Sequence, residues 1–153
     1  MSNNTTTQPE VQGAAVLAAA TFHHVGFVVA SISQVGPEFA RSLGAEWDGQ
    51  VIHDPLQQAR VTFLHCGASS NPTIELIEAD SHESPLNKFV AKGGGLHHIC
   101  YEVDALEAQL EFCRKQGSLI VRKPLPAAAF QGRSIAWVYT KQKLLVEYLE
   151  RQR

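Results

Sequence analysis

Cysteine is scarce in this chain, and its few copies lack the spacing of a structural site. The 153 residues contain three cysteines, an odd number, and no Cys-x-x-Cys pair occurs among them. We therefore expect neither a disulfide framework nor a thiolate zinc site, and a reducing, cytoplasmic setting is the better expectation.

Long apolar runs and a strong charge of either sign are also missing. The apolar segment 14–20 is far shorter than a bilayer span and follows no Lys or Arg, so neither a membrane helix nor a signal peptide is expected. The net charge of −2 gives no reason to expect nucleic acid or an anionic membrane as a partner. Residues 1–20 begin with an Asn-, Thr- and Gln-rich stretch, which predicts a disordered tail. The remaining residues, 21–153, suit one domain.

An internal repeat organises that domain. Residues 96–106 match residues 22–32 in character: an apolar residue, two histidines, an apolar run and a polar step into a helix. A second echo joins residues 73–78 to residues 145–150. The two echoes have nearly the same offset, 74 positions for the histidines and 72 for the glutamates. They predict a duplicated unit, with module one at 21–79, a bridge at 80–95 and module two at 96–150.

Each module is expected to have the element order βαβββ. The helix of module one begins at Ser31 or Ser33 and ends at Gly44, and that of module two runs from Asp104 as its cap to Gly117. Apolar patterns predict strands at residues 22–29, 46–52, 59–65, 73–78, 96–103, 118–122, 134–140 and 144–149. The predicted fold is therefore α+β, with tandem βαβββ modules forming a curved, partly open, barrel-like mixed sheet around a central cavity.

Strand alternation separates the two histidines of each pair. Side chains of a strand point to opposite faces in turn. His24 and His98 share a face with the small residues Gly26 and Cys100, so they are expected to point toward the cavity. The first histidine of each pair is expected to point the other way, into packing or toward an edge; these are His23 and His97.

One imidazole and one carboxylate from each module would then meet in the concave sheet. A lone strand histidine is usually a core residue and a lone strand glutamate usually faces solvent, but a repeated pair of pairs favours a metal site. Nitrogen and oxygen ligands suit Co, Ni, Mn, Zn or Fe. The predicted ligands are His24, Glu75, His98 and Glu147, called the His/Glu cluster below.

Three segments carry a resemblance to a known family: IELIE at 74–78, SPLNKFV at 84–90 and GLHHICYEVD at 95–104. With them the chain resembles the vicinal oxygen chelate superfamily, and within it the methylmalonyl-CoA epimerases. The resemblance implies paired βαβββ modules around a metal held by the His/Glu cluster, and a homodimer. It also implies an enzyme that removes the α-proton of a small-molecule thioester such as an acyl-CoA. Glu147 is the expected base, with Glu75 as a possible second acid/base.

The sequence departs from the epimerases at two places. Residues 139–143 lack the proline and glycine expected before the last strand, and residues 57–62 lack a second carboxylate base. Five basic residues either meet the phosphates of a CoA-like tail or are ordinary solvated surface: Arg122, Lys123, Arg133, Lys141 and Lys143.

Alternative functions stay open at this point. A glyoxalase I-type (lactoylglutathione) lyase resembles this chain in using two histidines and two glutamates. A metal-free protein that sequesters a small molecule, as resistance-type members of the superfamily do, would not require all four residues. An extradiol dioxygenase is less favoured, because it resembles a site of two histidines and one glutamate and leaves Glu75 without a role.

Overall fold

The computed structural model describes residues 20–67 and 73–152. Module one consists of β1 (Thr21–Val28), α2 (Ile32–Leu43), β2 (Ile52–Asp54), β3 (Ala59–His65) and β4 (Thr73–Ala79). The bridge holds α3 (Asn87–Val90). Module two consists of β5 (Gly95–Val103), α4 (Leu106–Lys115), β6 (Leu119–Pro126), the 3₁₀ turn η1 (Ala128–Phe130), β7 (Ser134–Tyr139) and β8 (Leu145–Glu150). The predicted α+β fold with tandem βαβββ modules is confirmed. The predicted disordered tail lies outside the described residues, apart from its last residue.

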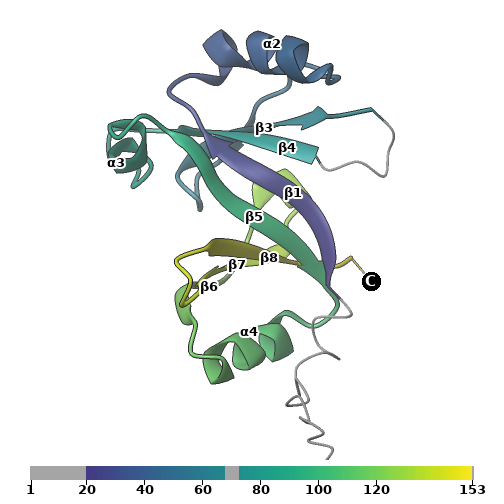
Figure 1. Ribbon diagram of the computed structural model, residues 1–153, viewed down its shortest axis with the longest axis vertical. Coiled ribbons are helices and arrows are strands. Elements are labelled where there is room, and N and C mark those ends of the chain that lie inside the picture. The colour runs from purple at the N-terminus through teal and green to yellow at the C-terminus, as the bar shows by residue number, and fades with distance from the viewer. Residues whose placement is uncertain (1–19, 68–72, 153) are drawn as a thin grey trace, which may run out of the picture.

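One curled sheet contains all eight strands, in the order β2-β3-β4-β1-β5-β8-β7-β6. The antiparallel pair β1–β5 joins the modules. On one side of this pair β4 runs parallel to β1, and on the other side β8 runs parallel to β5. Figure 1 shows β1 and β5 crossing the middle of the molecule side by side, with α2 and α4 at opposite ends. This topology places the strands that carry the predicted cluster next to one another.

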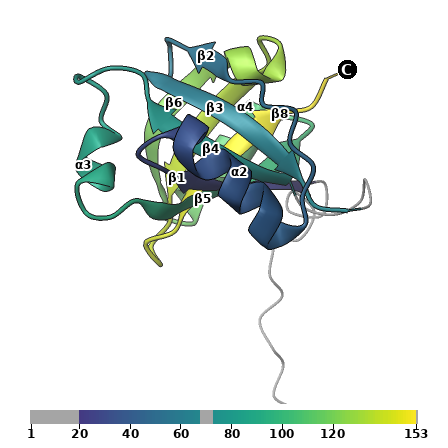
Figure 2. The same cartoon turned by 90° about the horizontal axis from the view of Figure 1, so that it is seen from above.

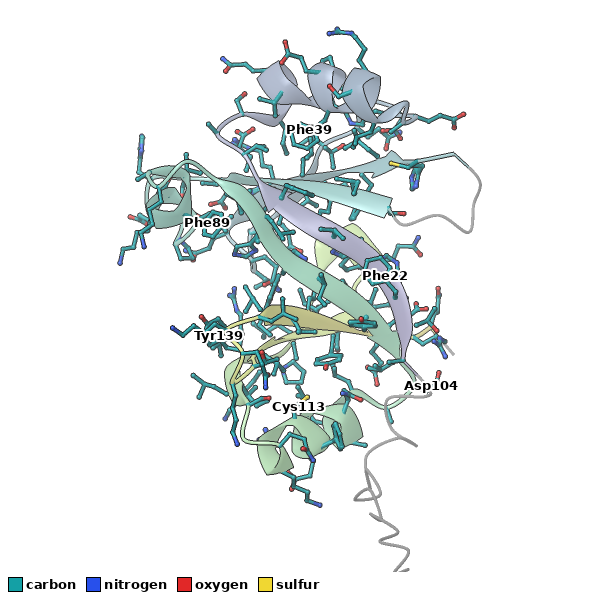
Figure 3. The ribbon with its side chains drawn as sticks, in the orientation of Figure 1. Phe22, Phe39, Phe89, Asp104, Cys113 and Tyr139 are labelled. Atoms are coloured by element: carbon teal, nitrogen blue, oxygen red, sulfur yellow. The ribbon has the colours of Figure 1, made fainter. Side chains whose placement is uncertain are left out.

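The two long helices cover the outer face of the sheet. Phe39 of α2 packs against Phe27 of β1 at a centroid distance of 5.7 Å, and α2 lies over the first module when the molecule is seen from above (Figure 2). Leu110 and Cys113 of α4 are buried against β7 and β8; Figure 3 labels Phe39 and Cys113 on their helices. None of the described helices has the length and apolarity needed to cross a membrane.

The edges of the curled sheet are joined by side chains from opposite modules. Asp54 in β2 accepts a hydrogen bond from the backbone N–H of Ala128 in η1 (2.7 Å). Arg122 in β6 donates to the side-chain oxygen of Gln57 (3.1 Å) and to the backbone carbonyl of Leu56. These contacts close the sheet over its concave face.

Three predicted boundaries were wrong. The strand expected at 118–122 is β6, which continues to Pro126 because Leu125 and Pro126 still pair with β7. The strand expected at 46–52 is instead β2 at Ile52–Asp54, because Asp48 accepts a hydrogen bond from the Gln50 N–H and Gly49 adopts a φ of 76°, which breaks the extended chain. The expected cap Asp104 forms an ion pair with Arg151, and α4 starts after Ala105. A local turn at Asp48 and a long-range ion pair at Asp104 thus replaced the expected structure.

Candidate metal centre

Each histidine pair stands at a β-bulge. In the β1–β5 ladder, β1 has one extra residue at His23, and β5 has one extra residue at His97. A bulge interrupts the alternation of side chains and re-aims the extra residue. His23 therefore lies against His24, with 2.8 Å between their Nδ1 atoms, and His97 lies against His98, with 3.1 Å. The prediction that the first histidine of each pair turns to the opposite face was wrong.

The four side chains of the His/Glu cluster meet in the interior. Their exposed fractions are 0% for His24, 1% for His98, 5% for Glu75 and 3% for Glu147. The two imidazole Nε2 atoms are 3.0 Å apart. The Oε2 atoms of the two glutamates lie 3.2–3.6 Å from both of these nitrogens. The strands β4, β1, β5 and β8, which are neighbours in the sheet, thus each contribute one donor atom to the cluster.

This arrangement fits a metal ion. Ligand bonds of about 2.1 Å place neighbouring donor atoms about 3.0 Å apart at right angles and about 3.4 Å apart in a tetrahedron. The spacings of 3.0–3.6 Å in the cluster are close to these values. Moreover, the buried Oε2 of Glu147 has no hydrogen-bond partner among the described residues, although two imidazoles lie beside it. A buried carboxylate oxygen without a donor is a ligand position for a cation.

The electrostatics of the cluster also require positive charge. Burial opposes ionisation of Glu147, but His24 and His98 outweigh it and hold the pKa of that carboxyl well below its usual range. Burial likewise lowers the pKa of His24, but Glu75 and Glu147 outweigh it and raise that pKa to about 10. Two carboxylates in an apolar interior need a proton or a metal ion between them.

Metal binding is expected to strengthen as the pH rises, because the ion must displace the proton of His24. With the pKa of His24 raised to about 10, the ion-free site keeps that proton near neutral pH. Affinity should therefore increase up to about tenfold per pH unit between about pH 7 and 9, with about one proton released per ion. By linkage, charged His24 stabilises the ion-free fold below pH 6.5, and this stabilisation is lost as the pH rises through about 10.

Calorimetry at several pH values, in buffers of different ionisation enthalpy, measures both quantities. A pH-independent affinity without proton release would contradict the assignment of that proton to His24.

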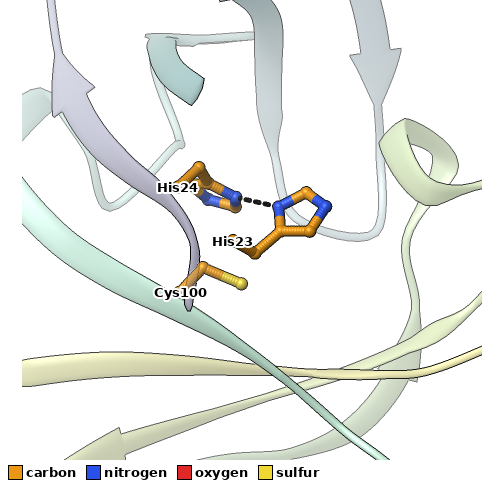
Figure 4. Close-up of side chains that lie close together, drawn as sticks. All are labelled: His23, His24 and Cys100. Carbon is orange, nitrogen blue, oxygen red and sulfur yellow. Dashed lines mark hydrogen bonds between the residues drawn. The ribbon is translucent and has the colours of Figure 1, made fainter. Parts of the chain in front are cut away.

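The neighbours of the cluster are neutral. Burial, followed by the charge of His98, lowers the pKa of His97 to about 4. Burial and His24 lower the pKa of His23 in the same way. Cys100 lies beside His23 and His24 (Figure 4), but burial and then Glu147 raise the pKa of its thiol, which stays protonated. Cys100 is therefore a small packing residue rather than a nucleophile.

A cavity of about 510 Å³ opens beside the cluster. Glu75 and Glu147 line it together with His97 and with aromatic and aliphatic side chains, whereas His24 and His98 are not among the lining residues. Three basic side chains also line it: Lys88 and Lys92 from the bridge and Arg122 from β6.

Comparison with known families decides the classification. The sequence profile of the glyoxalase/bleomycin resistance protein/dioxygenase superfamily matches residues 23–137. The chain belongs to this superfamily.

Several epimerases are similar to this member of the superfamily. The ethylmalonyl-CoA/methylmalonyl-CoA epimerase of Cereibacter sphaeroides is 27% identical over 121 residues, which are 78% of this chain and 87% of that one. The crystal structure of methylmalonyl-CoA epimerase from Mycobacterium tuberculosis is similar with a TM-score of 0.74 at 24% identity, covering 86% of this chain and 88% of that one. A Streptomyces coelicolor methylmalonyl-CoA epimerase variant in complex with 2-nitronate-propionyl-CoA has a TM-score of 0.73 at 20% identity, covering 86% and 97%. The two solved structures show the shared fold.

The sequence did not predict which basic residues line the cavity. Of the five basic residues considered for a CoA-like tail, only Arg122 lines it. Arg133 pairs with Glu102 instead. Lys88 and Lys92 were not considered; their spacing of four on a helical bridge next to the repeat was the available signal.

The substitution Gly26→Ala tests how closely the backbone of β1 packs against the His98 ring of the His/Glu cluster. A Cβ at this position would lie 2.1 Å from Cε1 of His98, so the ring must move out of the cluster. We expect a loss of about 1–3 kcal/mol in the free energy of unfolding and weaker metal binding, measured by thermal denaturation and calorimetry. Gly36→Ala is the matched control, because its Cβ meets the Trp47 ring at 2.6 Å, away from the cluster. Equal metal affinities for the two variants would contradict the expectation.

Proposed function

We propose that this protein is a divalent-metal-dependent isomerase that epimerises an acyl thioester of the methylmalonyl-CoA kind by abstraction of the α-proton. One observation carries the proposal: beside a cavity of about 510 Å³, the Nε2 atoms of His24 and His98 lie 3.0 Å apart, and a carboxylate oxygen of each of Glu75 and Glu147 lies 3.2–3.6 Å from both nitrogens. Its similarity to named methylmalonyl-CoA epimerases supports this reaction over the lyase and sequestration alternatives.

His24, Glu75, His98 and Glu147 would hold the metal ion. When bound, a divalent ion supplies Lewis-acid stabilisation of the negative charge that develops on a substrate carbonyl oxygen. The apolar walls exclude water and strengthen this interaction. Co, Ni, Mn, Zn and Fe all suit these ligands, and the metal is not specified by ligand type alone.

Glu147 is the proposed base. A general base must reach the proton that it removes, and Glu147 lines the cavity beside which the cluster lies. The C–H electron pair moves into the carbonyl as Glu147 takes the α-proton. Glu75 approaches from β4, on the other side of the β1–β5 pair from the β8 strand that carries Glu147. In the proposed step Glu75 enters the turnover carrying a proton and gives it to the opposite face of the α-carbon, which forms the other epimer. The proton taken by Glu147 then leaves to solvent, and Glu75 takes one up before the next turnover.

The charge around the cavity supports an anionic substrate. Lys88, Lys92 and Arg122 line it, whereas the carboxylate of its third acidic residue, Asp54, already accepts hydrogen bonds from the backbone of Gln57 and Ala128. An acyl-CoA carries phosphates that such cations would bind. The homodimer and the cytoplasmic location expected from the sequence stay predictions.

An exchange assay in deuterated water tests the proposal. Metal-loaded protein is expected to incorporate deuterium at the α-carbon of methylmalonyl-CoA and to interconvert its epimers, as followed by NMR. The hemithioacetal of methylglyoxal and glutathione is the parallel substrate. Turnover of the hemithioacetal alone would establish the lyase alternative. Tight binding of a thioester by metal-free protein without exchange would establish sequestration.

A further inference from the structure

His97 has two ring nitrogens with different surroundings. Its Nδ1 lies 3.1 Å from Nδ1 of His98, a distance at which one nitrogen carries the proton and the other accepts it. Its Nε2 has no hydrogen-bond partner among the described residues. The ring stands edge-on between Phe89 (5.1 Å, 90°) and Trp137 (5.8 Å, 64°), which line the cavity as His97 itself does.

The neighbouring ligand sets the tautomer of His97. This step rests on the proposed function: if Nε2 of His98 binds the metal, the proton of that ring is on Nδ1. Nδ1 of His98 then donates to Nδ1 of His97 at 3.1 Å, and a His97 ring that accepts through Nδ1 carries its proton on Nε2. The bulge at His97 makes this contact possible, because it brings two consecutive side chains to the same side of β5.

We propose that His97 is a further catalytic residue, which donates a hydrogen bond from Nε2 to the substrate oxygen that gains negative charge as the α-proton leaves. The donor is fixed before the substrate arrives, since its tautomer is set by His98 and its ring is held by two aromatic side chains. A preorganised donor of this kind stabilises developing charge without reorganisation. His97 also lines the same cavity as the proposed base, Glu147.

His23 provides an internal comparison. It makes the same Nδ1 contact with its ligand neighbour, His24, at 2.8 Å. Its ring packs against Phe130 at a centroid distance of 5.5 Å, and it is not among the residues that line the cavity. His23 is therefore a positioning residue for His24 only, whereas His97 combines positioning of His98 with a donor to the substrate.

Two isosteric variants separate the two nitrogens of His97. The Oδ1 of asparagine replaces Nδ1 as acceptor, so His97→Asn is expected to keep the wild-type affinity for Co²⁺ while kcat falls about 10²–10³-fold with little change in KM. The Nε2 of glutamine replaces the cavity donor, so His97→Gln is expected to keep most of kcat at saturating Co²⁺ while Co²⁺ affinity falls about 10–100-fold. His53→Asn is the control, expected to change neither quantity, because the His53 side chain is 58% exposed, pairs with Asp80 and does not line the cavity.

Co²⁺ affinity is read by calorimetry and visible absorption, and ¹⁵N NMR of the wild-type protein loaded with Zn²⁺ reads the tautomer directly. The proposal is overturned if His97 carries its proton on Nδ1, or if kcat of His97→Asn falls no further than that of His53→Asn. Failure of the proposed function is a separate result, seen as wild-type protein that binds no Co²⁺ or exchanges no α-proton. In that case a His97 ring without a proton on Nε2 still overturns the donor assignment.

Discussion

Glu147→Gln is expected to slow α-proton exchange on methylmalonyl-CoA by about 10²–10⁴-fold, the contribution typical of a general base. Glutamine preserves the shape of the side chain and an oxygen that can face the metal, but it cannot take a proton. The substitution also removes one negative charge from beside the proposed ion, because an amide replaces the carboxylate. Oε2 of Glu147, which is buried without a hydrogen-bond donor, is the atom affected. The rate of deuterium incorporation at saturating metal measures the effect.

Glu150→Gln is the matched control, since Glu150 lies on the same strand, β8, and is not among the residues that line the cavity. Its exchange rate should equal that of the wild type. If Glu147→Gln keeps more than a tenth of the wild-type rate, Glu147 is not the base.

Removal of the metal is expected to lower thermal stability strongly. Free metal at about 1,000 times its dissociation constant stabilises the folded state by about 4 kcal/mol. At about 2–4 °C per kcal/mol for a domain of this size, the midpoint of unfolding should fall by about 8–16 °C on chelation. The effect should be large because the proposed ligands come from four strands and both modules, so that a bound ion would join the two halves of the sheet. Calorimetric scans with and without chelator, followed by metal addition, measure the shift.

The double variant His24→Ala, His98→Ala is the control for chelator effects elsewhere in the protein. It is expected to be insensitive to both chelator and metal. A wild-type midpoint that also responds to neither, in protein that still exchanges the α-proton, would rule out a structural metal in the cluster.

The duplication explains why so much of the fold was predictable. Two echoes of similar offset fixed the βαβββ order, and alternation placed His24 and His98 on the concave face, where they are buried. Glu75 and Glu147 follow from the same repeat, because each stands on the strand parallel to the one that carries its module's histidine. That the four side chains bind a metal stays a prediction.

The bulges at His23 and His97 could not be derived from alternation, which assumes one residue per step on both strands. A bulge depends on the pairing of two distant strands, and only the β1–β5 register reveals it. The doubled histidine at the same point of both modules was the available signal. Strand alternation predicted that His23 and His97 pack away from the cavity. In the structure both imidazole rings instead lie against histidines of the cluster.

The walls of the cavity were the least predictable part. Lys88 and Lys92 come from the bridge, whose position is set by tertiary packing rather than by the repeat. Asp54 stood in a segment with the composition of a turn, yet it is 2% exposed and joins β2 to η1 across the sheet edges. Such contacts arise only when the sheet curls.

A crystal of the protein loaded with Co²⁺ tests the central claim most directly, because anomalous scattering locates the ion without reference to activity. The expected result is one peak per chain, about 2.0–2.2 Å from Nε2 of His24, Nε2 of His98 and one carboxylate oxygen of each of Glu75 and Glu147. A peak elsewhere, or one bound by residues of a single module, would contradict the account.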